Sequence, residues 1–458
     1  MTCSVVIPCH NRVDLTRACL QSLQRQVSAP DLEILVVDNG SHDGTATLSG
    51  PGVRVLSLRE NRGFAAGVNH GLRQARGDTL LVLNNDTQLA DNVLHEMHAA
   101  LQSDRVIAAV GAMSNEVKGH AQLEVGRRGE SAAGRRQIAD ELRSAPRLQD
   151  VSTLSGLCLL LRRAALDTVG VFDERFGHGN FEDDDLCLRL RLHGHRLGLA
   201  RRAFVHHEGH ATFSALGLDV FAEIRRRRRQ FDAKWQSDPA GRATIAALDD
   251  DVVRAGSAAE EGRLLWPRWA DADWHLGRAA AAQREPRRAA RHFTALLRHC
   301  PHHVDAQLAL GSCQLEAGQP EAAQATFAFA AGQQLSRLQQ QYLLEQLGAH
   351  AYRDGRPADA GASFQAAVRL GGDPRGVLHN WIGLCQLASG QLDTAERTFT
   401  TAAEQGLGIA HTNLGICAYQ RGDYVLARRC FATACERAPD DPVARENYAK
   451  LCELVPAG

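Results

Sequence analysis

Four polar residues directly follow an apolar run at residues 80–83, and they offer amide, carboxylate and hydroxyl groups: Asn84, Asn85, Asp86 and Thr87. A short, unbroken apolar run is typical of a strand that is buried on both faces of a parallel sheet. Open α/β sheets bind their ligands outside the carboxyl ends of such strands. Residues 84–87 are therefore a candidate binding site, and a simple polar turn is the alternative interpretation.

Four consecutive acids form a second candidate for chemistry: Glu182, Asp183, Asp184 and Asp185. Apolar residues with helical spacing follow at Leu186, Cys187 and Leu190, which predicts a helix with the acids in its first turn. Negative charge at a helix amino end is favourable by itself, by about 0.3–1 kcal/mol per residue, so capping is the alternative. Mutual repulsion of the four carboxylates raises at least one pKa, which suits a group that accepts a proton.

Three histidines lie within five residues: His206, His207 and His210. Imidazole nitrogen is a common metal ligand, although a surface loop is the default interpretation for any single histidine. This segment is a third candidate site.

These candidates need a scaffold, and alternating strands and helices supply one. Apolar runs at residues 5–7, 34–37 and 53–58 precede the strand at 80–83, with helical periodicity between them. This pattern predicts a parallel α/β sheet with right-handed crossovers. Pro8 is expected to end the first strand, because proline cannot donate to a sheet ladder. The carboxyl ends of the strands then form one rim, which carries Pro8, Asp38 and Asp86.

A glycine-rich segment follows the third strand, and it includes Asn61, Gly63 and Gly67. Glycines allow close approach of a ligand to the backbone, and the amino end of the following helix favours anions. Tight helix packing is an equally good explanation of the glycines.

Taken together, four motifs occur in the order in which family 2 inverting glycosyltransferases of the GT-A fold carry them, and the chain resembles that family. They are residues 5–11 (VVIPCHN), 36–41 (VVDNGS), 61–67 (NRGFAAG) and 83–87 (LNNDT). Two amides before a single aspartate make the chain most similar to the rhamnosyltransferase-like branch.

The resemblance implies a nucleotide-sugar donor that is bound by residues of these motifs: Pro8, Asn11, Asp38, Asn61, Gly63, Asn84 and Asn85. It also implies that Asp86 and His207 hold a divalent cation, Mg²⁺ or Mn²⁺, at the donor diphosphate. His206 is the alternative to His207, and Thr212 occupies the hydroxyl position that follows.

The resemblance further implies that the acidic motif supplies the general base. Asp183 matches the base, and Glu182 matches the acid before it. Asp184 occupies a position that is more often apolar or aromatic, so it remains an alternative base. A single in-line displacement needs only one such base.

Composition excludes several other classes. The 52 Lys and Arg residues against 53 Asp and Glu leave no net field for nucleic acid or an anionic membrane. Twelve cysteines without any pair at two-residue spacing indicate reduced core residues and a cytoplasmic protein. With no leader and no apolar run of about 18 residues, we expect a soluble or at most a peripheral protein.

Residues 118–150 lack periodicity, so we expect a mobile loop or insertion there, with an acceptor-binding lid as the alternative. Arg225 to Arg229 are expected on a solvated helix face, with contact to a diphosphate or acidic acceptor as the alternative. The resemblance places the end of the catalytic domain after Lys234 and Trp235, so we assign it residues 1–238, followed by a linker at 239–269.

The second half repeats a pattern at intervals of 32 to 37 residues. A glycine preceded by leucine or isoleucine recurs at Gly277, Gly311, Gly348, Gly383 and Gly415. Each is followed by an alanine and, four residues after it, a phenylalanine: Phe293, Phe327, Phe364, Phe399 and Phe431. Two short helices per unit predict a solenoid, and the pattern resembles tetratricopeptide repeats. We assign about five repeats plus a capping helix to residues 270–458, which bind a protein partner or another copy of the chain.

The sequence thus predicts an α/β domain with a Rossmann-like, mostly parallel sheet, followed by an all-α solenoid. The resemblance implies a glycosyltransferase that moves a sugar to a hydroxyl of a glycan, a lipid-linked glycan or a protein. A repeat scaffold with a non-catalytic nucleotide-sugar-binding domain is the alternative. A nucleotidyltransferase would need a longer, basic, glycine-rich loop after the first strand, and the residues from Pro8 to Asn11 do not provide it.

Overall fold

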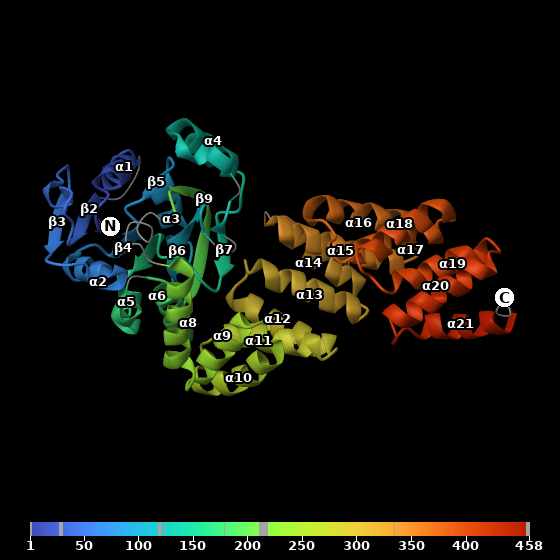
Figure 1. Ribbon diagram of the computed structural model, residues 1–458. Coiled ribbons are helices and arrows are strands. Elements are labelled where there is room, and N and C mark those ends of the chain that lie inside the picture. Colours follow the sequence, from blue (N-terminus) through green and yellow to red (C-terminus); the bar gives the residue numbers. More distant parts are fainter. Residues whose placement is uncertain are drawn as a thin grey trace. The chain divides into compact units, whose positions relative to one another are not determined.

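The computed structural model describes residues 2–26, 31–117, 121–123, 125–177, 179–209, 219–333 and 335–454. The chain divides into two compact units, Met1–Gln334 and Leu335–Gly458. The first unit contains the sheet and the helices up to α14, and the second contains α15 to α21 (Figure 1). This confirms the predicted α/β domain followed by a helical solenoid.

The strands of the sheet follow in the order β3 (Val53–Leu58), β2 (Asp31–Asn39), β1 (Thr2–Cys9), β4 (Thr79–Leu83), β8 (Cys158–Arg162), β6 (Ile107–Ser114), β9 (Arg196–His207) and β5 (Thr87–Leu89). The first four strands are parallel. Beyond them the sheet is mixed: β8 is antiparallel to β4 and β6, and β9 is parallel to β6. Both β5 and β7 (Leu148–Val151) run antiparallel to β9.

Pro8 does not end the first strand, contrary to the prediction. Strand β1 continues to Cys9, with Pro8 paired to Val37 of β2. On its other side, the pairing of β1 with β4 ends at Val6 and Val82. Pro8 therefore lies beyond the end of the β1–β4 pairing, where no backbone N–H of β1 is needed as a donor to β4.

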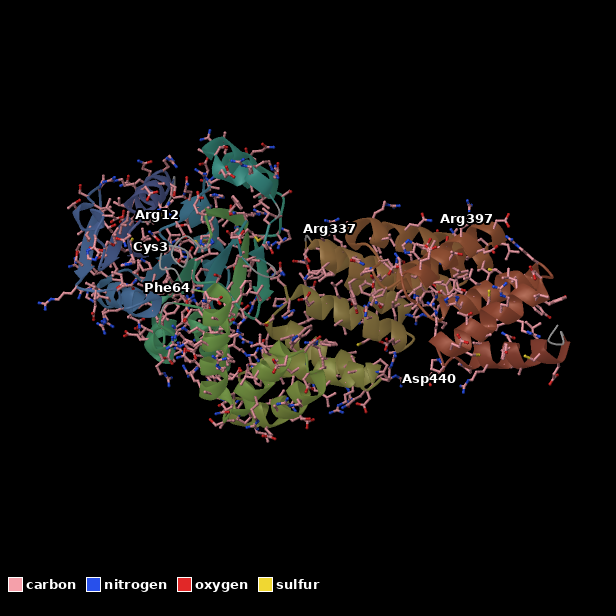
Figure 2. All side chains as sticks on the ribbon, viewed as in Figure 1. Cys3, Arg12, Phe64, Arg337, Arg397 and Asp440 are labelled. Carbon is pink, nitrogen blue, oxygen red and sulfur yellow. The ribbon has the colours of Figure 1, made fainter. Side chains whose placement is uncertain are left out.

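Helices cover both faces of the sheet, and the residues of β1 alternate between the two cores. Cys3, Val5 and Ile7 pack with α1 (Val13–Gln24), α3 (Val93–Gln102) and α4 (Ala132–Leu142). Val6 packs with the other layer, α2 (Phe64–Gln74), α5 (Arg163–Val169) and α6 (Glu182–Leu192) (Figure 1). Cys3, labelled in Figure 2, is completely buried. Burial on both faces explains why these strands read as unbroken apolar runs.

The segment expected as a loop within residues 118–150 is largely regular in its described part. It forms a 3₁₀ turn at Gly126–Glu130, then α4 and β7. Ser131 caps α4 by accepting a hydrogen bond from the backbone N–H of Gly134, and Ile138 and Leu142 are buried. Two apolar residues four apart are enough to anchor one face of α4. A pattern of only two residues is too short to predict a helix from the sequence.

Residues 239–269 were predicted to be a linker. Most of them instead form two helices, α9 (Pro239–Leu248) and α10 (Val252–Leu265). The carboxylates of Asp238 and Asp251 cap the two helices. Their buried faces are mostly alanine and glycine, which give only a weak periodic signal. One apolar cluster includes Trp235, alanines of α9 and α10, Trp269 and Leu276, and so spans the predicted boundary at residue 238.

The repeats form the expected helix pairs: α11 (Asp271–Ala282) with α12 (Pro286–His299), α13 (Val304–Glu316) with α14 (Pro320–Ala331), α15 (Arg337–Arg353) with α16 (Pro357–Gly371), α17 (Val377–Ala388) with α18 (Leu392–Glu404), and α19 (Ala410–Gln420) with α20 (Tyr424–Arg437). Helix α21 (Pro442–Leu454) follows the last pair. No helix among the described residues is long and apolar enough to cross a membrane.

The repeat motif has a steric cause. A Cβ atom on Gly277 would lie 2.6 Å from the ring of Phe293, and the other four repeats show the same relation between their glycine and phenylalanine. Real Cβ atoms do not approach a neighbour this closely, so glycine lets the two helices of each repeat cross in contact.

Candidate active site

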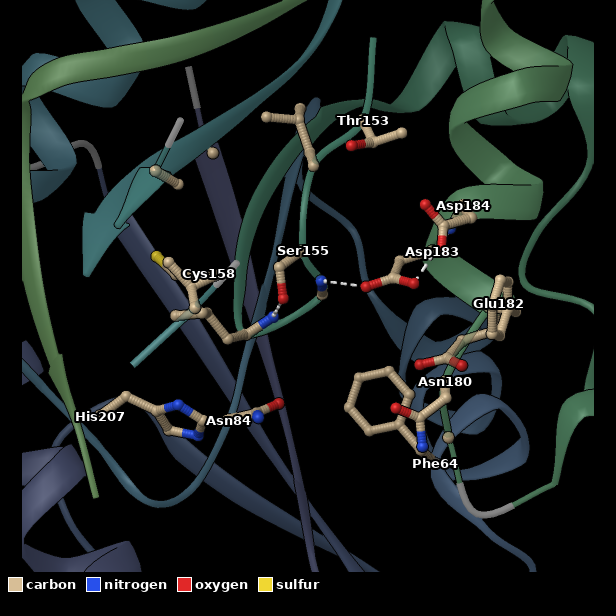
Figure 3. A pocket seen from close by; sticks show the side chains of 18 of the residues that line it. Phe64, Asn84, Thr153, Ser155, Cys158, Asn180, Glu182, Asp183, Asp184 and His207 are labelled. Atoms are coloured by element: carbon tan, nitrogen blue, oxygen red, sulfur yellow. Dashed lines mark hydrogen bonds between the residues drawn. The ribbon is translucent and has the colours of Figure 1, made fainter. Parts of the chain in front are cut away.

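A cavity of about 900 Å³ lies at the carboxyl ends of the first parallel strands. Nine of the eleven residues proposed from the sequence line it: Pro8, Asn61, Gly63, Asn84, Asn85, Asp86, Glu182, Asp183 and His207. In Figure 3, His207 and Asn84 lie on one side of the cavity, and Glu182, Asp183 and Asp184 lie on the other. The fold therefore brings together segments that are more than a hundred residues apart.

Pairing between β5 and β9 brings Asp86 to His207. Thr87, the first residue of β5, pairs with His207, the last residue of β9. The backbone N–H of Glu208 donates to the carbonyl oxygen of Asp86 at 3.1 Å. As a result, Nε2 of His207 lies 3.2 Å from Oδ1 of Asp86, and both side chains are largely buried.

The backbone around Glu116 sets the orientation of His207. Nδ1 of His207 lies 3.0 Å from the carbonyl oxygen of Glu116, so we assign the proton to Nδ1. Asn115 accepts from the backbone N–H of His207 and donates to its carbonyl oxygen. Burial lowers the pKa of His207, but the nearby carboxylate of Asp86 outweighs it, so the pKa lies above its usual value.

The pair of Asp86 and His207 suits a divalent cation. Oδ1 of Asp86 is buried without a well-aligned hydrogen-bond donor, although Nε2 of His207 is close to it. One carboxylate oxygen and one imidazole nitrogen side by side match the ligands of Mg²⁺ or Mn²⁺. No group of three or more His, Cys, Asp or Glu side chains arranged to hold a metal occurs in the described part of the chain. Among the described residues, Asp86 and His207 thus offer two of the ligands that such a cation needs.

His206, the alternative ligand, does not line the cavity. Successive side chains of a strand point to opposite faces, so His206 points away from His207. Its ring packs against Gly129, and its Nε2 lies 3.5 Å from a carboxylate oxygen of Glu208. Thr212, proposed for the hydroxyl position, and His210 lie outside the described residues.

The two asparagines before Asp86 differ in their surroundings. Asn85 is buried and donates to Oγ1 of Thr16 at 3.0 Å, which ties the loop to α1. Asn84 is anchored through its backbone N–H to the carbonyl oxygen of Leu157 at 2.9 Å. Its side-chain Oδ1 is buried and has no hydrogen-bond partner among the described residues. Asn84 is therefore the amide of this pair that has spare capacity for a ligand.

Asp38 and Asn11 do not line the cavity. Asp38 is buried and accepts from the backbone N–H of Ser41 at 2.9 Å. Asn11 accepts from the backbone N–H of His42, and its own N–H donates to Oγ of Ser41. In the structure both residues join the loops after β1 and β2.

Asn39 lines the cavity instead, and the sequence did not single it out. Its Nδ2 donates to Oδ1 of Asn61 at 3.1 Å and to the carbonyl oxygen of Gly63 at 2.9 Å. Its Oδ1 accepts from the backbone N–H of Arg62. Gly63 has φ of 86°, which favours glycine, at the start of α2. Asn39 thus organises the glycine-rich segment.

The first turn of α6 presents Asp183 to the cavity. Its Oδ2 accepts from the backbone N–H of Gly156 at 3.0 Å, and its Oδ1 accepts from that of Asp184 at 3.0 Å (Figure 3). Burial raises the pKa of Asp183, and these backbone hydrogen bonds oppose the rise. The neighbouring Glu182 is almost fully buried, and its burial together with the charge of Asp183 raises its pKa well above the usual value. Asp184 also lines the cavity.

The fourth acid, Asp185, has a different environment and is completely buried. It accepts hydrogen bonds from Nε of Arg189 and from Nε1 of Trp235, both at 2.9 Å. Nζ of Lys234 also lies between Asp185 and Asp173. The four acids therefore differ in role: Glu182, Asp183 and Asp184 line the cavity, whereas Asp185 joins α6 to α8 (Val220–Trp235).

The arginine run lies on α8 as expected. Arg225, Arg226 and Arg229 are exposed. Arg227, in contrast, is buried and lies 3.0 Å from the carboxylate of Glu223. Ile224 is the described residue of α8 that lines the cavity, so no arginine of the run does.

Sequence comparison finds similarity to known families in three segments of the chain. Residues 4–170 match the model of the family described as glycosyl transferase family 2. Residues 275–334 and 382–442 match that of the tetratricopeptide repeat.

Three curated proteins illustrate the similarity. An uncharacterized protein of Sinorhizobium fredii is 29% identical over 58% of this chain and 30% of its own length. The O-antigen biosynthesis protein RfbC of Myxococcus xanthus is 31% identical over 45% of this chain and 17% of its own length. The poly-β-1,6-N-acetyl-D-glucosamine synthase of Staphylococcus epidermidis is 24% identical over 42% and 45%. The chain thus spans less than half of each of these relatives.

Solved structures resemble parts of the chain only distantly. A chain of the APC/C hetero-tetramer Cut9–Hcn1 is 13% identical, with a TM-score of 0.42 over 53% of this chain and 50% of that one. A GalNAc-T7 structure is 17% identical, with a TM-score of 0.36 over 45% of this chain and 44% of that one. The sheet and the helix pairs agree with these sequence matches: residues 4–170 are similar to glycosyl transferase family 2, and residues 275–334 and 382–442 are similar to the tetratricopeptide repeat.

Proposed function

We propose that this protein transfers a sugar, with inversion, from a nucleoside-diphosphate sugar to a hydroxyl group of an acceptor. One observation carries the proposal: Asp86 with His207, and Asp183, face the same cavity from opposite walls. A transferase of this kind needs charge neutralisation at the leaving diphosphate on one side and a proton acceptor on the other. The matched family supports this reading.

On the donor side, Asp86 and His207 would hold Mg²⁺ or Mn²⁺, which would neutralise the charge of the departing diphosphate. Asn84 offers a free amide oxygen, and Asn61 and Gly63 line the same cavity. Helix α2 begins after Gly63, and the positive end of its dipole favours an anion. Asp38 and Asn11 act on the donor through the loops that they join.

On the acceptor side, Asp183 takes the proton from the attacking hydroxyl. Its raised pKa makes it a better proton acceptor than an ordinary, solvated aspartate. The backbone N–H of Gly156 fixes the carboxylate in place. Glu182 is nearly fully buried behind it, and Asp184 is the alternative base.

Finer assignments complete the proposal. The two amides before Asp86 suggest a hexosyl or rhamnosyl donor, and the acceptor is a glycan, a lipid-linked glycan or a protein. All twelve cysteines are free and nine are buried, which supports a cytoplasmic location. The repeats bind a protein partner. In the alternative, a scaffold with a non-catalytic domain, the buried carboxylates of Glu182 and Asp183 with their raised pKa values would have no use.

The experiment that tests the proposal measures nucleoside diphosphate release from a panel of sugar donors, with Mn²⁺, with Mg²⁺ and with a chelator. We expect release with one donor class, dependent on the metal. Asp183→Asn is expected to abolish transfer while donor binding, measured by calorimetry, remains. Absence of release with every donor would favour the scaffold, and unchanged turnover in Asp183→Asn would refute the assignment of the base.

A further inference from the structure

The first two repeats contribute side chains to the cavity that also contains Asp86 and Asp183. They are Trp274 of α11, and His303 and Asp305 at the start of α13. All of them belong to the same compact unit as the sheet. The repeat array is therefore part of the cavity wall, which its resemblance to protein-binding solenoids does not predict.

Hydrogen bonds in both directions fix this wall to the sheet. The backbone N–H of Asp150 in β7 donates to the carbonyl oxygen of His302 at 3.1 Å. The backbone N–H of His302 in turn donates to Oδ2 of Asp150 at 2.8 Å. Asp150 is almost completely buried and also accepts two hydrogen bonds from the guanidinium of Arg196, each at 2.9 Å. The turn before α13 therefore has a defined position on the sheet.

The Trp274 ring is held in place from several sides. The ring of His303 lies 5.1 Å from it, that of Phe293 lies 5.7 Å from it, and the guanidinium of Arg278 lies over it at 5.8 Å. Nδ1 of His303 accepts from the backbone N–H of Ala306 at 3.2 Å, which fixes the imidazole as the cap of α13. Despite these neighbours, Trp274 is only partly buried. A fixed, partly exposed indole is suited to stacking against a ligand.

The chemistry of this wall matches a sugar ring. An indole packs against the C–H face of a pyranose, and a carboxylate such as Asp305 accepts charge-assisted hydrogen bonds from its hydroxyls. Ser152 and Thr153, which follow β7, add hydroxyl groups to the same cavity. We propose that Trp274 and Asp305 bind the acceptor as a saccharide, an inference that rests on the proposed sugar transfer.

Volume favours a saccharide over a protein surface. The cavity of about 900 Å³ is at the upper end of the range for small-molecule sites, about 300–1,000 Å³, and it must also hold the donor. The room that remains beside a donor suits a small ligand such as a saccharide. A peptide acceptor is the competing outcome of the test.

The test uses the full chain and the donor found by nucleotide release. Methyl glycosides and disaccharides are added as acceptors, and the acceptor KM and donor KM are measured separately. Trp274→Ala and Asp305→Asn are expected to raise the acceptor KM by about tenfold or more, and by more than any change in the donor KM. Trp274→Phe keeps an aromatic ring against Phe293 and is expected to have a smaller effect in the same direction.

Two matched controls lie on repeats and do not line the cavity. Tyr424→Ala removes an exposed aromatic side chain, and Asp359→Asn neutralises an acid in the first turn of α16. Both variants are expected to keep the acceptor KM and the donor KM within about twofold of the values of the parent protein. Circular dichroism checks that every variant is folded.

The outcomes separate the two proposals. If no donor releases nucleotide, sugar transfer itself fails, and the acceptor site fails with it. If release depends on Asp183 but no saccharide accelerates it, or if a peptide does so instead, only the acceptor proposal is overturned. The same holds if the acceptor KM of folded Trp274→Ala and Asp305→Asn equals that of the parent protein.

Discussion

Nε1 of Trp235 donates a hydrogen bond to Oδ1 of Asp185 at 2.9 Å, and Asp185 is completely buried. This contact joins the last turn of α8 to the first turn of α6, two residues after the proposed base Asp183. A residue that looks like part of an acidic active-site motif therefore serves to position the helix that carries it.

We expect Trp235→Phe to reduce the free energy of unfolding by about 1–3 kcal/mol, because it leaves a buried carboxylate oxygen with one donor fewer. Denaturant unfolding measures this loss. Tyr419→Phe, which removes a hydroxyl from an exposed ring, is the control and should change stability by less than about 0.5 kcal/mol. Equal stabilities for Trp235→Phe and the parent would show that Lys234 and Arg189 alone satisfy Asp185.

Metal binding should depend on the donor. Because the described residues supply one carboxylate and one imidazole, we expect weak Mn²⁺ binding to the protein alone and much tighter binding when a nucleoside diphosphate is present. Titration calorimetry with and without the diphosphate tests this. Asp86→Asn and His207→Ala should each weaken the ternary complex by about tenfold or more. Tight Mn²⁺ binding without any nucleotide would contradict this ligand set.

Activity should fall on the acid side of neutrality. Asp183 must be deprotonated to accept a proton, and burial raises its pKa. The rate therefore drops as pH falls through this raised pKa, at a higher pH than an ordinary aspartate would give. The pH profile of kcat/KM for the full chain provides the measurement. A profile that is flat down to the usual aspartate range would rule out a buried carboxylate as the base.

Stability should change with pH in the opposite sense. Glu182 has a folded-state pKa well above its unfolded value, so the folded state retains a proton that the unfolded state has lost. The free energy of unfolding therefore decreases as pH rises from the unfolded pKa of Glu182 to its folded one. Glu182→Gln should remove much of this dependence and be more stable than the parent at neutral pH. Denaturant unfolding at several pH values is the test.

The repeat glycines should not tolerate a methyl group. A Cβ on Gly383 would lie 2.5 Å from the ring of Phe399, so Gly383→Ala should cost about 1–3 kcal/mol through overpacking. Gly361→Ala is the matched control, because a Cβ there would lie 3.5 Å from Cys385, an ordinary contact. Since alanine favours helix over glycine, this control should be neutral or stabilising by up to about 1 kcal/mol. Thermal unfolding of both variants distinguishes them.

Much of this architecture could be predicted from local patterns. Unbroken apolar runs indicated the strands around Val6 and Leu81, and the recurring glycine and phenylalanine indicated the repeats, because both patterns arise from packing that each short segment shows by itself. The motif around Asp86 was also visible, since it directly follows a buried strand.

Other features depended on information that no local pattern contains. Asp38 and Asn39 are neighbours on one strand, and only the register of β2 decides that Asn39 lines the cavity. Likewise, only the register of β9 against β5 decides that His207, and not His206, lines the cavity. One donor to Asp183 is the backbone N–H of Gly156, a distant residue whose type does not reveal this contact. Trp274 reaches the cavity through long-range packing of a repeat against the sheet.

The division between the two compact units falls after α14, inside the repeat array and not at the end of the matched transferase region. One apolar cluster ties Leu188 of α6 to Trp269 and to Leu276 of α11. Cooperativity on unfolding should therefore follow these units, with the sheet and the first two repeats melting together. Exchanging the repeats of such a chain for those of another at the family boundary would cut through a single folding unit, whereas a join after α14 would preserve it.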